Sequence, residues 1–462
     1  MSGRPDSAQR DAGHNLEIRR QMREIEQAIL ARAPEHDLEP SLDRIAAVMN
    51  LLGDPQHAFP VIHVTGTNGK TSTTRMIERL LREMGLSTGR FTSPHLHSIR
   101  ERISLNGEGI DAERFIASYE DVIPFIEMVD ARSAADGDPR MTYFEVLVAV
   151  AYAAFADAPV DVAIVEVGMG GSWDATNVVD AKVAVLMPVA IDHERFLGSS
   201  LEAIAAEKVG IIKPGSVVVS GLQEPEVAQI LVDRVREVGA TPALEGNEFG
   251  ILSRAVAVGG QQLAIRGLGG DYDDLFLPLH GPHQGHNAAI ALAAVEAFVG
   301  GGEHRLDIEV IRAGLAGVTS PGRLEIVRRS PTVLVDAAHN PAGAMALRTA
   351  MEDSFNFAKV VGVIAILEDK DASTILEILE PVLNEVVVSR TTSPRAITPD
   401  RLGALAREIY GEDRVTVIDN LPDALDRAAG MADEGGVGGA VLATGSITTA
   451  AEVRMLLGVT DG

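Results

Sequence analysis

Residues 61–74, VIHVTGTNGKTSTT, contain the residue types that bind a nucleotide phosphate. A β-branched apolar run stops at a glycine-containing turn, and Gly69, Lys70 and Thr71 then open an apolar helical stripe. This order aims backbone N–H groups and the positive end of a helix dipole at an anion, with a lysine for the outer phosphates and a hydroxyl for Mg²⁺. Val64 occupies the first glycine position of the strict G-x-x-x-x-G-K-[ST] pattern. An ordinary strand-to-helix turn is the alternative, but the flanking strand and helix favour an ATP site.

Other polar residues, of types that are costly in free energy to bury, follow the ends of further apolar runs. Ser93, Glu166 and His193 each lie at or just past the end of an expected strand. Ligands of parallel sheets bind at the carboxyl ends of the strands, so we expect these side chains near the phosphate loop. A bare carboxylate in a dry strand is costly, so Glu166 forms either a structural ion pair or, as we favour, an Mg²⁺ site. His193 is either a hydrogen-bonded structural residue or a second metal ligand.

Lys208 lies on the apolar stripe of a helix that begins after Ser199. It follows Leu201 by seven residues, and Ile204 and Ala205 share the stripe, so its amine should point inward. Such a lysine can extend its amine to solvent or form an internal salt bridge. Alternatively, burial lowers the pKa of the amine, and the neutral amine reacts with CO₂. The carbamate would then be an anionic oxygen ligand for a second Mg²⁺.

The composition limits the class of protein. A chain of 462 residues exceeds what one core usually supports, so we expect two domains. The net charge of −26 argues against a nucleic-acid partner. The absence of cysteine excludes disulfides and thiolate zinc sites. The first fifteen residues lack the apolar core of a secretory signal, and no apolar stretch could span a bilayer. We therefore expect a cytoplasmic protein without a membrane partner.

Apolar strands alternate with helices along the chain, which predicts an α/β fold. Runs such as Val162–Val165 lack polar alternation, so both faces of a mostly parallel sheet should be covered by helices. Helices are expected at 16–33, 41–53 (with Ser41 as N-cap) and 286–298, and short strands at 249–279. Strands are expected at 61–65, 87–91, 160–167, 183–191 and 216–220, then at 332–335, 360–366, 385–389, 415–418 and 440–443. A joint at 317–323 divides a P-loop-type sheet domain (1–318) from a smaller Rossmann-like α/β domain (319–462).

With these residues in view, the chain resembles the folylpolyglutamate synthase and dihydrofolate synthase family, relatives of the Mur ligases. The resemblance runs from about residue 41 to the C-terminus, and the order and number of motifs carry it rather than any single one. The motifs are GTNGKTS at 66–72, TSPHL at 92–96, TYFE at 142–145, EVGMGG at 166–171, DATN at 174–177, DH at 192–193, EKVGI at 207–211, PGR at 321–323 and DAAHNP at 336–341. By this resemblance, residues 1–318 are the ATP-binding domain with N-terminal helices, and 319–462 the C-terminal ligase domain.

The resemblance also implies roles for individual residues. It implies ATP contacts from Gly66, Thr67, Asn68, Gly69, Lys70, Thr71, Ser72, Asn287, Arg323, Asp336 and His339. It implies two Mg²⁺ sites formed by Ser93, Glu166, His193 and a carboxylated Lys208, with Lys70, Lys208 and His193 as catalytic residues. It implies pteroate contacts from Asp43, Arg44, Thr142, Tyr143, Phe144, Glu145, Ser172, Trp173 and Asp174. The chain departs from the family at Ser172, where arginine is common, and at Arg195, where an acidic residue is common.

Three of these residues also have a structural interpretation. Thr142 and Glu145 have the spacing of a capping box at the start of an apolar helix. Trp173 is the single tryptophan, a residue type usually found in the core, but it lies in a glycine-rich loop where a substrate could reach it. The sequence leaves both interpretations of Trp173 open.

The activity that the resemblance implies is ATP-dependent addition of L-glutamate to dihydropteroate or a reduced folate, through an acyl phosphate, by a monomer. A Mur-type ligase of cell-wall precursors would share this mechanism, but it would want a separate nucleotide-binding domain ahead of the ATP domain. A GTPase would want an Asn/Thr-Lys-x-Asp motif, and no lysine of this chain lies in that context. A kinase would transfer phosphate to a hydroxyl, and ADP release would then not depend on glutamate.

Overall fold

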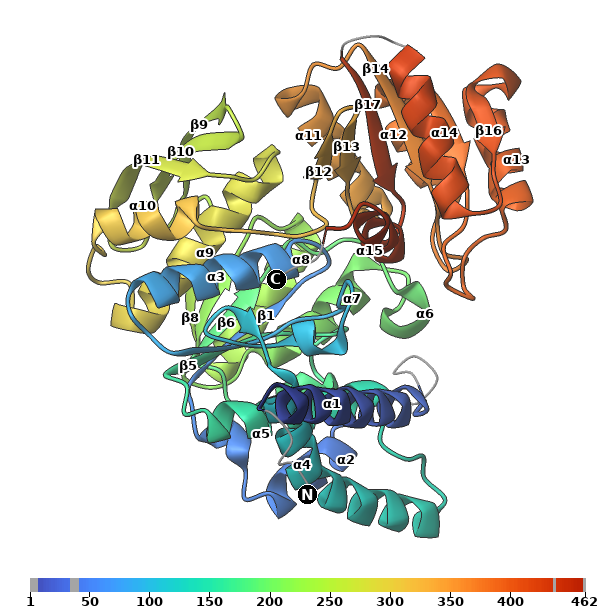
Figure 1. Cartoon of the computed structure of the whole chain (residues 1–462). Coiled ribbons are helices and arrows are strands. Elements are labelled where there is room, and N and C mark those ends of the chain that lie inside the picture. Colours follow the sequence, from blue (N-terminus) through green and yellow to red (C-terminus); the bar gives the residue numbers. More distant parts are fainter. Residues whose placement is uncertain (1–6, 34–40, 435–437, 460–462) are drawn as a thin grey trace, which may run out of the picture.

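The computed structural model describes residues 7–33, 41–434 and 438–459 (Figure 1). Its largest sheet has eight strands in the order β4-β3-β2-β5-β1-β6-β7-β8. The strands from β2 to β8 in this order pair in parallel, whereas β2–β3 and β3–β4 are antiparallel. The strands are β1 (Val61–Thr65), β2 (Thr88–Phe91), β3 (Ile103–Leu105), β4 (Glu108–Gly109), β5 (Val162–Glu166), β6 (Val183–Leu186), β7 (Val217–Ser220) and β8 (Thr241–Leu244). The predicted mostly parallel sheet is therefore confirmed.

Helices cover both faces of this sheet because its central strands are apolar on both sides. Val61 and Val165 pack in one core cluster with the helices of one face, and Ile62 and Ile164 pack in another cluster on the opposite face. The first face carries α1 (Ser7–Leu30), α2 (Asp43–Leu51), α4 (Ala112–Asp136) and α5 (Tyr143–Asp157). The opposite face carries α3 (Lys70–Glu83), α9 (Pro282–Gly300) and α10 (Ile308–Ala316). A further cluster joins β6 and β7 to α6 (Glu194–Leu197), α7 (Leu201–Lys208) and α8 (Pro225–Val238).

The short strands expected at 249–279 form a separate antiparallel sheet in the order β11-β10-β9. Its strands are β9 (Gly250–Ala257), β10 (Gly260–Arg266) and β11 (Asp271–Leu277). Leu263, Ile265 and Leu275 are buried in the same cluster as α9 and α10, so this small sheet extends the core over those helices (Figure 1).

The C-terminal unit, which we define as residues 325–459, is built on a six-stranded sheet in the order β12-β13-β17-β14-β15-β16. All its strand pairs are parallel except β12–β13. The strands are β12 (Glu325–Arg329), β13 (Thr332–Val335), β14 (Lys359–Ile364), β15 (Glu385–Val388), β16 (Val415–Val417) and β17 (Gly439–Thr444). One face carries α11 (Pro341–Ser354), α12 (Ala372–Leu379) and α13 (Pro399–Tyr410), and the other carries α14 (Leu421–Glu434) and α15 (Ile447–Leu456) (Figure 1).

Single-turn 3₁₀ helices connect several of these elements. They are η2 (Pro55–His57), η3 (Ile99–Arg102), η4 (Ala175–Val178), η5 (Val209–Ile211), η6 (Glu380–Val382) and η7 (Glu412–Arg414). The expected joint at 317–323 lies between the end of α10 and the start of β12. None of the helices in the described part of the chain is long and apolar enough to span a membrane.

The prediction that Ser41 caps the second helix is wrong. Helix α2 begins at Asp43 with Leu42 in the N-cap position, and no side chain caps it. The Ser41 hydroxyl accepts the Asp43 N–H at 3.0 Å instead, one residue too early for a cap. Helix α1 also begins and ends earlier than expected, because local patterns place the ends of a helix poorly.

The strand expected at 183–191 is too long, because β6 ends at Leu186. Pro188 cannot donate to a sheet ladder, and the chain beyond β6 instead pairs with the turn after β1. The Thr67 N–H donates to the Pro188 carbonyl at 3.1 Å, and the Thr67 hydroxyl donates to the Ala190 carbonyl at 2.9 Å. A Cβ on Gly66 would lie 2.4 Å from the Cβ of Met187, so this close approach requires glycine. The segment after β6 therefore supports the phosphate loop.

Candidate active site

The phosphate loop joins β1 to α3 and is shaped by two glycines. Gly69 has a φ of 84° and precedes Lys70, the first residue of α3. The Lys70 ammonium folds back over the loop and donates to the carbonyls of Gly66 at 3.0 Å and Thr67 at 3.2 Å. Burial lowers the pKa of Lys70, although Glu166 and Asp192 act in the opposite direction. The amino end of α3 and this lysine therefore present positive charge at one place.

Asn287, on α9, lies directly against the phosphate loop. A Cβ on Gly69 would be 2.8 Å from its Oδ1 atom. The Asn287 amide is buried and donates to Gln284 Oε1 at 3.0 Å. The structure therefore brings this predicted ATP-binding residue, more than two hundred positions away in the chain, to the loop that carries Lys70.

Glu166 is the last residue of β5, the neighbour of β1, and is 1% exposed. Its Oε1 atom accepts the Thr71 hydroxyl at 2.9 Å, and its Oε2 atom accepts the Ser93 N–H at 3.4 Å. Burial raises the pKa of Glu166, opposed by the nearby charges of Lys70 and Arg323. Both hydrogen bonds come from neutral donors. The carboxylate and the hydroxyl of Thr71 are hard oxygen ligands of the kind that Mg²⁺ prefers.

Lys208, the last residue of α7, points inward as its position on the apolar stripe predicts. It is 4% exposed, and its Nζ atom donates to the Gly66 carbonyl at 3.0 Å. Burial, together with the charge of Lys70, lowers the pKa of Lys208 to about 7. The amine does not extend to solvent, and it lies against the phosphate loop.

One pocket contains both Lys70 and Lys208, together with His193. It is lined by Thr65, Gly66, Thr67, Lys70, Val167, Gly168, Met169, Gly170, Asp192, His193, Leu197 and Lys208. The three residues predicted to be catalytic, Lys70, His193 and Lys208, are thus at the same site. The His193 backbone has a φ of 53° at the start of α6. Its ring stays partly exposed, yet burial lowers the pKa of His193 to about 4 against the opposing charge of Asp192.

The types of donor atom at this site support metal binding, but the side chains do not form a complete set of metal ligands. Among the described residues, no group of three or more histidine, aspartate or glutamate side chains has a spacing that could hold a metal ion. The oxygen atoms of Glu166 and Thr71, 2.9 Å apart, are of the type that a divalent cation prefers, and the His193 ring lines the pocket that also contains Lys70. A second site would need the carbamate of Lys208, because an amine offers no oxygen.

The glycine-rich loop after β5 contacts the carboxyl end of α7, which carries Lys208. The N–H and the hydroxyl of Ser172 both donate to the Glu207 carbonyl at 3.0 Å, and the Trp173 N–H donates to Glu207 Oε1 at 3.2 Å. A Cβ on Gly171 would lie 2.7 Å from the carbonyl oxygens of both Glu207 and Lys208. The polar groups of Ser172 are therefore used within the protein, whereas the Trp173 ring is half-buried beside the apolar cluster of α6 and α7.

Gly171→Ala is expected to lower kcat by about tenfold, because the methyl group must push the segment that holds Lys208 away from the phosphate loop. Steady-state ADP release measures this. Gly430→Ala is the matched control, because Gly430 lies in α14 and no atom would lie within 4 Å of the added methyl group. The control should be as active as the wild type and no less stable to heat. Equal activity of the two variants would show that the contact with Lys208 does not matter.

Asp174 shapes the same loop from inside. Its carboxylate accepts the Met169 N–H at 2.9 Å and the Thr176 N–H at 3.0 Å, together with the Thr176 hydroxyl. Burial raises the pKa of Asp174, opposed by these hydrogen bonds. These hydrogen bonds hold the loop between β5 and η4 in shape.

Two segments predicted to bind the pteroate are brought into contact. The Thr142 hydroxyl accepts the Glu145 N–H at 3.1 Å, and the Glu145 carboxylate accepts the Thr142 N–H at 2.7 Å, so the capping box is confirmed. The same carboxylate accepts Arg44 Nε at 3.0 Å in a buried ion pair. Asp43 is farther out and bonds to Ser41. This contact joins α2 to the start of α5.

Aromatic residues link that contact to the strand ends. The Phe144 ring lies 5.7 Å from the Phe91 ring, and a Cβ on Gly168 would be 2.5 Å from Phe144. The Arg102 guanidinium lies 5.0 Å from the centre of the Tyr143 ring. Phe144 therefore lies against the same loop whose other end contacts the Lys208 segment, whereas Tyr143 packs on Arg102.

The joint contributes Arg323, and the C-terminal unit contributes Asp336, just after the end of β13. Asp336 accepts the N–H groups of Leu324 and Ala338, both at 2.8 Å, and so holds the joint against β13. Burial raises the pKa of Asp336, and the charge of Arg323 opposes this shift as it does for Glu166. Arg323 is thus close to acidic groups of both units.

The sequence analysis assigned no role to three residues here: Asp192, Asn340 and Lys370. Asp192 accepts Lys370 Nζ at 2.6 Å and Asn340 Nδ2 at 2.8 Å, and His339 Nε2 lies at 3.5 Å. Burial alone would raise the pKa of Asp192, but His339, His193 and Lys370 lower it well below its usual range. The DH and HNP motifs indicated two of these positions. Lys370 had a weaker signal, a charged residue soon after an apolar strand.

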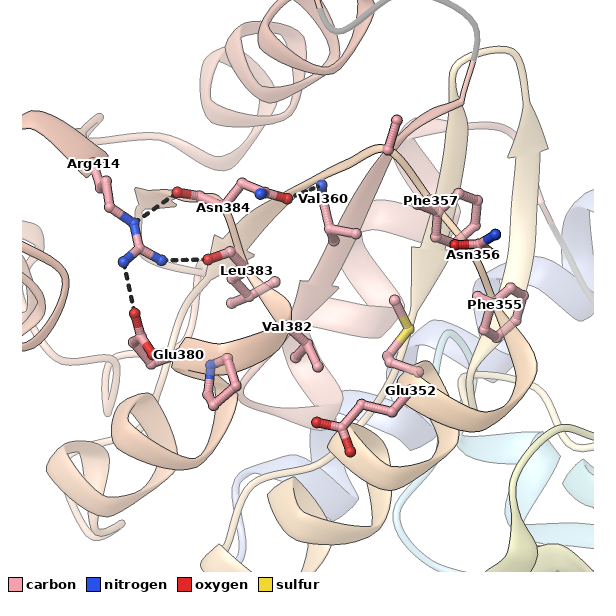
Figure 2. A pocket seen from close by; sticks show the side chains of 13 residues that line it. Glu352, Phe355, Asn356, Phe357, Val360, Glu380, Val382, Leu383, Asn384 and Arg414 are labelled. Carbon is pink, nitrogen blue, oxygen red and sulfur yellow. Dashed lines mark hydrogen bonds and ion pairs between the residues drawn. The ribbon is translucent and has the colours of Figure 1, made fainter.

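A cavity of about 510 Å³ lies in the C-terminal unit, away from this site (Figure 2). It is at the amino ends of β14 and β15, whereas Asp336 and Asn340 follow the carboxyl end of β13. Figure 2 shows Arg414 bonded to Glu380 and to the carbonyls of Leu383 and Asn384, so the Arg414 guanidinium is satisfied within the lining. It contains none of the predicted site residues.

Comparison with known proteins places these features in a family. Residues 64–295 match the Mur ligase middle domain, and residues 322–447 match the Mur ligase, glutamate ligase domain. A dihydrofolate synthase/folylpolyglutamate synthase of Mycobacterium tuberculosis is 49% identical over 94% of this chain and 93% of that protein. The folylpolyglutamate synthase of the same organism, complexed with ADP and AMPPCP, superimposes with a TM-score of 0.91, 47% identity and coverage of 96% of this chain and 100% of that one. An FPGS–AMPPCP–folate complex gives a TM-score of 0.80 with 31% identity, covering 94% and 99%.

Proposed function

Because the chain belongs to the folylpolyglutamate synthase and dihydrofolate synthase family of Mur ligases, we propose that it is an ATP-dependent ligase that adds L-glutamate to dihydropteroate, to reduced folates, or to both. The observation that carries the proposal is the pocket shared by the phosphate loop, Lys70, His193 and Lys208. Solved relatives with ADP, AMPPCP and folate support ATP and a folate as its ligands. We expect it to act as a cytoplasmic monomer.

In the first step, a carboxylate oxygen of the pteroate or folate attacks the γ-phosphorus of ATP. The new P–O bond gives an acyl phosphate, and the bond to ADP breaks. The chain must hold the two reactants in line and balance the negative charge. Lys70 in the phosphate loop and Arg323 in the joint supply positive charge, and the N–H groups at the start of α3 cradle the phosphates.

In the second step, the amine of L-glutamate attacks the acyl carbon, the C–N bond forms and inorganic phosphate leaves with the loss of a proton from the amine. Water would destroy the acyl phosphate, so closure of the C-terminal unit over the site protects it. Asn287, Asp336 and His339 would help to hold the nucleotide between the units.

Two Mg²⁺ ions are the expected cofactors, and bound Mg²⁺ supplies charge neutralisation for the phosphates. Ser93, Glu166 and His193 would hold them, with Lys208 once it carries a carbamate. The lowered pKa of Lys208 supports this modification, because the neutral amine is the form that reacts with CO₂. For the pteroate, the partly exposed rings of Tyr143 and Trp173 would offer stacking surfaces, and the buried Phe144 would support them from beneath.

Purified protein with ATP and Mg²⁺, given dihydropteroate or tetrahydrofolate, tests the function. We expect ADP release that depends on both the folate substrate and L-glutamate, and a product lengthened by one glutamate in mass spectrometry. ADP release without glutamate would indicate a kinase. A preference for GTP over ATP would indicate a nucleotide switch protein. Activity with a nucleotide-linked peptide precursor in place of the folate would favour a Mur-type cell-wall ligase.

A further inference from the structure

The carboxylate of Asp192 bonds to residues from both units of the protein. Its Oδ1 atom accepts hydrogen bonds from Lys370 Nζ at 2.6 Å and from the backbone N–H of the next residue, His193, at 2.8 Å. Its Oδ2 atom accepts Asn340 Nδ2 at 2.8 Å. Lys370 and Asn340 belong to the C-terminal unit, whereas Asp192 follows β6 in the large sheet. This carboxylate therefore joins the two units.

The same network reaches the phosphate loop. Asn340 and Asn68 form a reciprocal amide pair, in which each Nδ2 donates to the other's Oδ1 at 3.2 Å. The Asn340 Oδ1 atom also accepts the Gly343 N–H at 2.7 Å, which fixes the amide at the start of α11. A movement of the C-terminal unit away from Asp192 would therefore also break the contact with Asn68.

Lys370 supplies the charge that this network needs. The side chains of Lys370 and Asp192 are 8% and 7% exposed, so the pair is shielded from water. The other acidic neighbour of Lys370, Asp369, lies at 3.9 Å and is half-exposed. Removal of one member of a buried pair leaves an uncompensated charge, and a unit free to move will then open to let water reach it.

We propose that Lys370 is a positioning residue. Through Asp192, it holds the C-terminal unit closed on the phosphate loop and keeps Asn340 against Asn68. This inference rests on the proposed function only for its kinetic test. It assigns Lys370 no contact with the substrate, so its whole effect must pass through Asp192.

The first test is a double-mutant cycle on kcat with glutamate-dependent ADP release. Lys370→Met is expected to lower kcat by about 10- to 100-fold, because the groups on the two units lose alignment. In an Asp192→Asn background, Lys370→Met should change kcat by less than about twofold, because the charge it compensates is gone. If the fold losses in kcat of the two single variants multiply in the double variant, the proposal is overturned, because Lys370 would then act independently of Asp192.

The matched control is Lys359→Met. Lys359 pairs with Glu385 at 2.6 Å in the same unit, at the amino end of β14, whereas Lys370 follows the carboxyl end of that strand. Lys359→Met should lower the thermal midpoint, because it also removes an ion pair, but leave kcat unchanged. If both variants lower kcat in proportion to lost stability, Lys370 is merely structural and the proposal fails.

The second test measures closure directly and needs no activity. The chain has no cysteine, so Glu120→Cys on α4 and Glu408→Cys on α13, both exposed, accept spin labels without background. With ADP bound, the inter-unit distance distribution should be narrow in the parent and in Lys359→Met, and broader and longer in Lys370→Met. An unchanged distribution in Lys370→Met would overturn the proposal. Failure of glutamate-dependent ADP release in the parent would reject the proposed function but leave this test intact.

Discussion

Lys70→Met is expected to lower kcat for glutamate-dependent ADP release by about 10²- to 10³-fold, the largest effect of any substitution proposed for this protein. The ammonium now donates to the carbonyls of Gly66 and Thr67, which it can exchange for phosphate oxygens when ATP binds. Negative charge spreads over the γ-phosphoryl group during transfer, so a cation held in a buried loop stabilises the transition state more than the ground state. We therefore expect a larger change in kcat than in the KM for ATP.

Lys182→Met is the control for this experiment. Lys182 donates to the Phe298 carbonyl at 2.8 Å and is outside the residues that line the active-site pocket. It should leave kcat within about twofold of the wild type, with some loss of thermal stability. A Lys70→Met enzyme with more than a tenth of wild-type kcat would contradict the phosphate-binding role of the loop.

Lys208→Ala is expected to remove most turnover, about a hundredfold in kcat, and to leave the protein folded. The substitution removes both the amine beside Gly66 and the group that would carry the carbamate. Added bicarbonate should not restore activity, because alanine has no amine to modify. Circular dichroism should retain the wild-type spectrum. Near-normal activity of Lys208→Ala would exclude the second metal site.

Labelled bicarbonate tests the carbamate itself. With ¹³C-bicarbonate, the wild type should show a carbamate signal by NMR that Lys208→Ala lacks. A pKa of about 7 makes half of the Lys208 amines neutral at pH 7, whereas an ordinary lysine is almost wholly charged there. The neutral fraction of the Lys208 amine, which reacts with CO₂, should therefore rise above pH 7 and fall about tenfold for each pH unit below 7. A signal that decreased from pH 6 to pH 8 would contradict this account.

Much of the site could be predicted because its signals are local. The strand–glycine–lysine order of the phosphate loop needs about a dozen adjacent residues, and β1 and α3 lie where that order places them. The inward position of Lys208 follows from a seven-residue spacing on one helix. Glu166 is conspicuous because a carboxylate ends an otherwise apolar strand.

Some local signals were present but were not used. The antiparallel hairpin of β3 and β4 turns at Asn106 and Gly107, which have φ values of 52° and 84°. Asn-Gly is the strongest short signal for such a turn, yet the two short strands beside it are weakly apolar. Strands β8 and β12 were missed for a similar reason: each is a short strand, half-exposed or more, with little burial to mark it.

The order of residues along the chain was enough to identify which side chains could do chemistry and which strand or helix each one ends. Those properties depend on residue type, periodicity and turn chemistry within a short stretch of chain. The contacts of Asp192 with Lys370 and Asn340, and of Arg44 with Glu145, became visible only in the folded protein. These partners are more than a hundred residues apart, and their contact depends on how helices and two separate sheets pack, which no local pattern encodes.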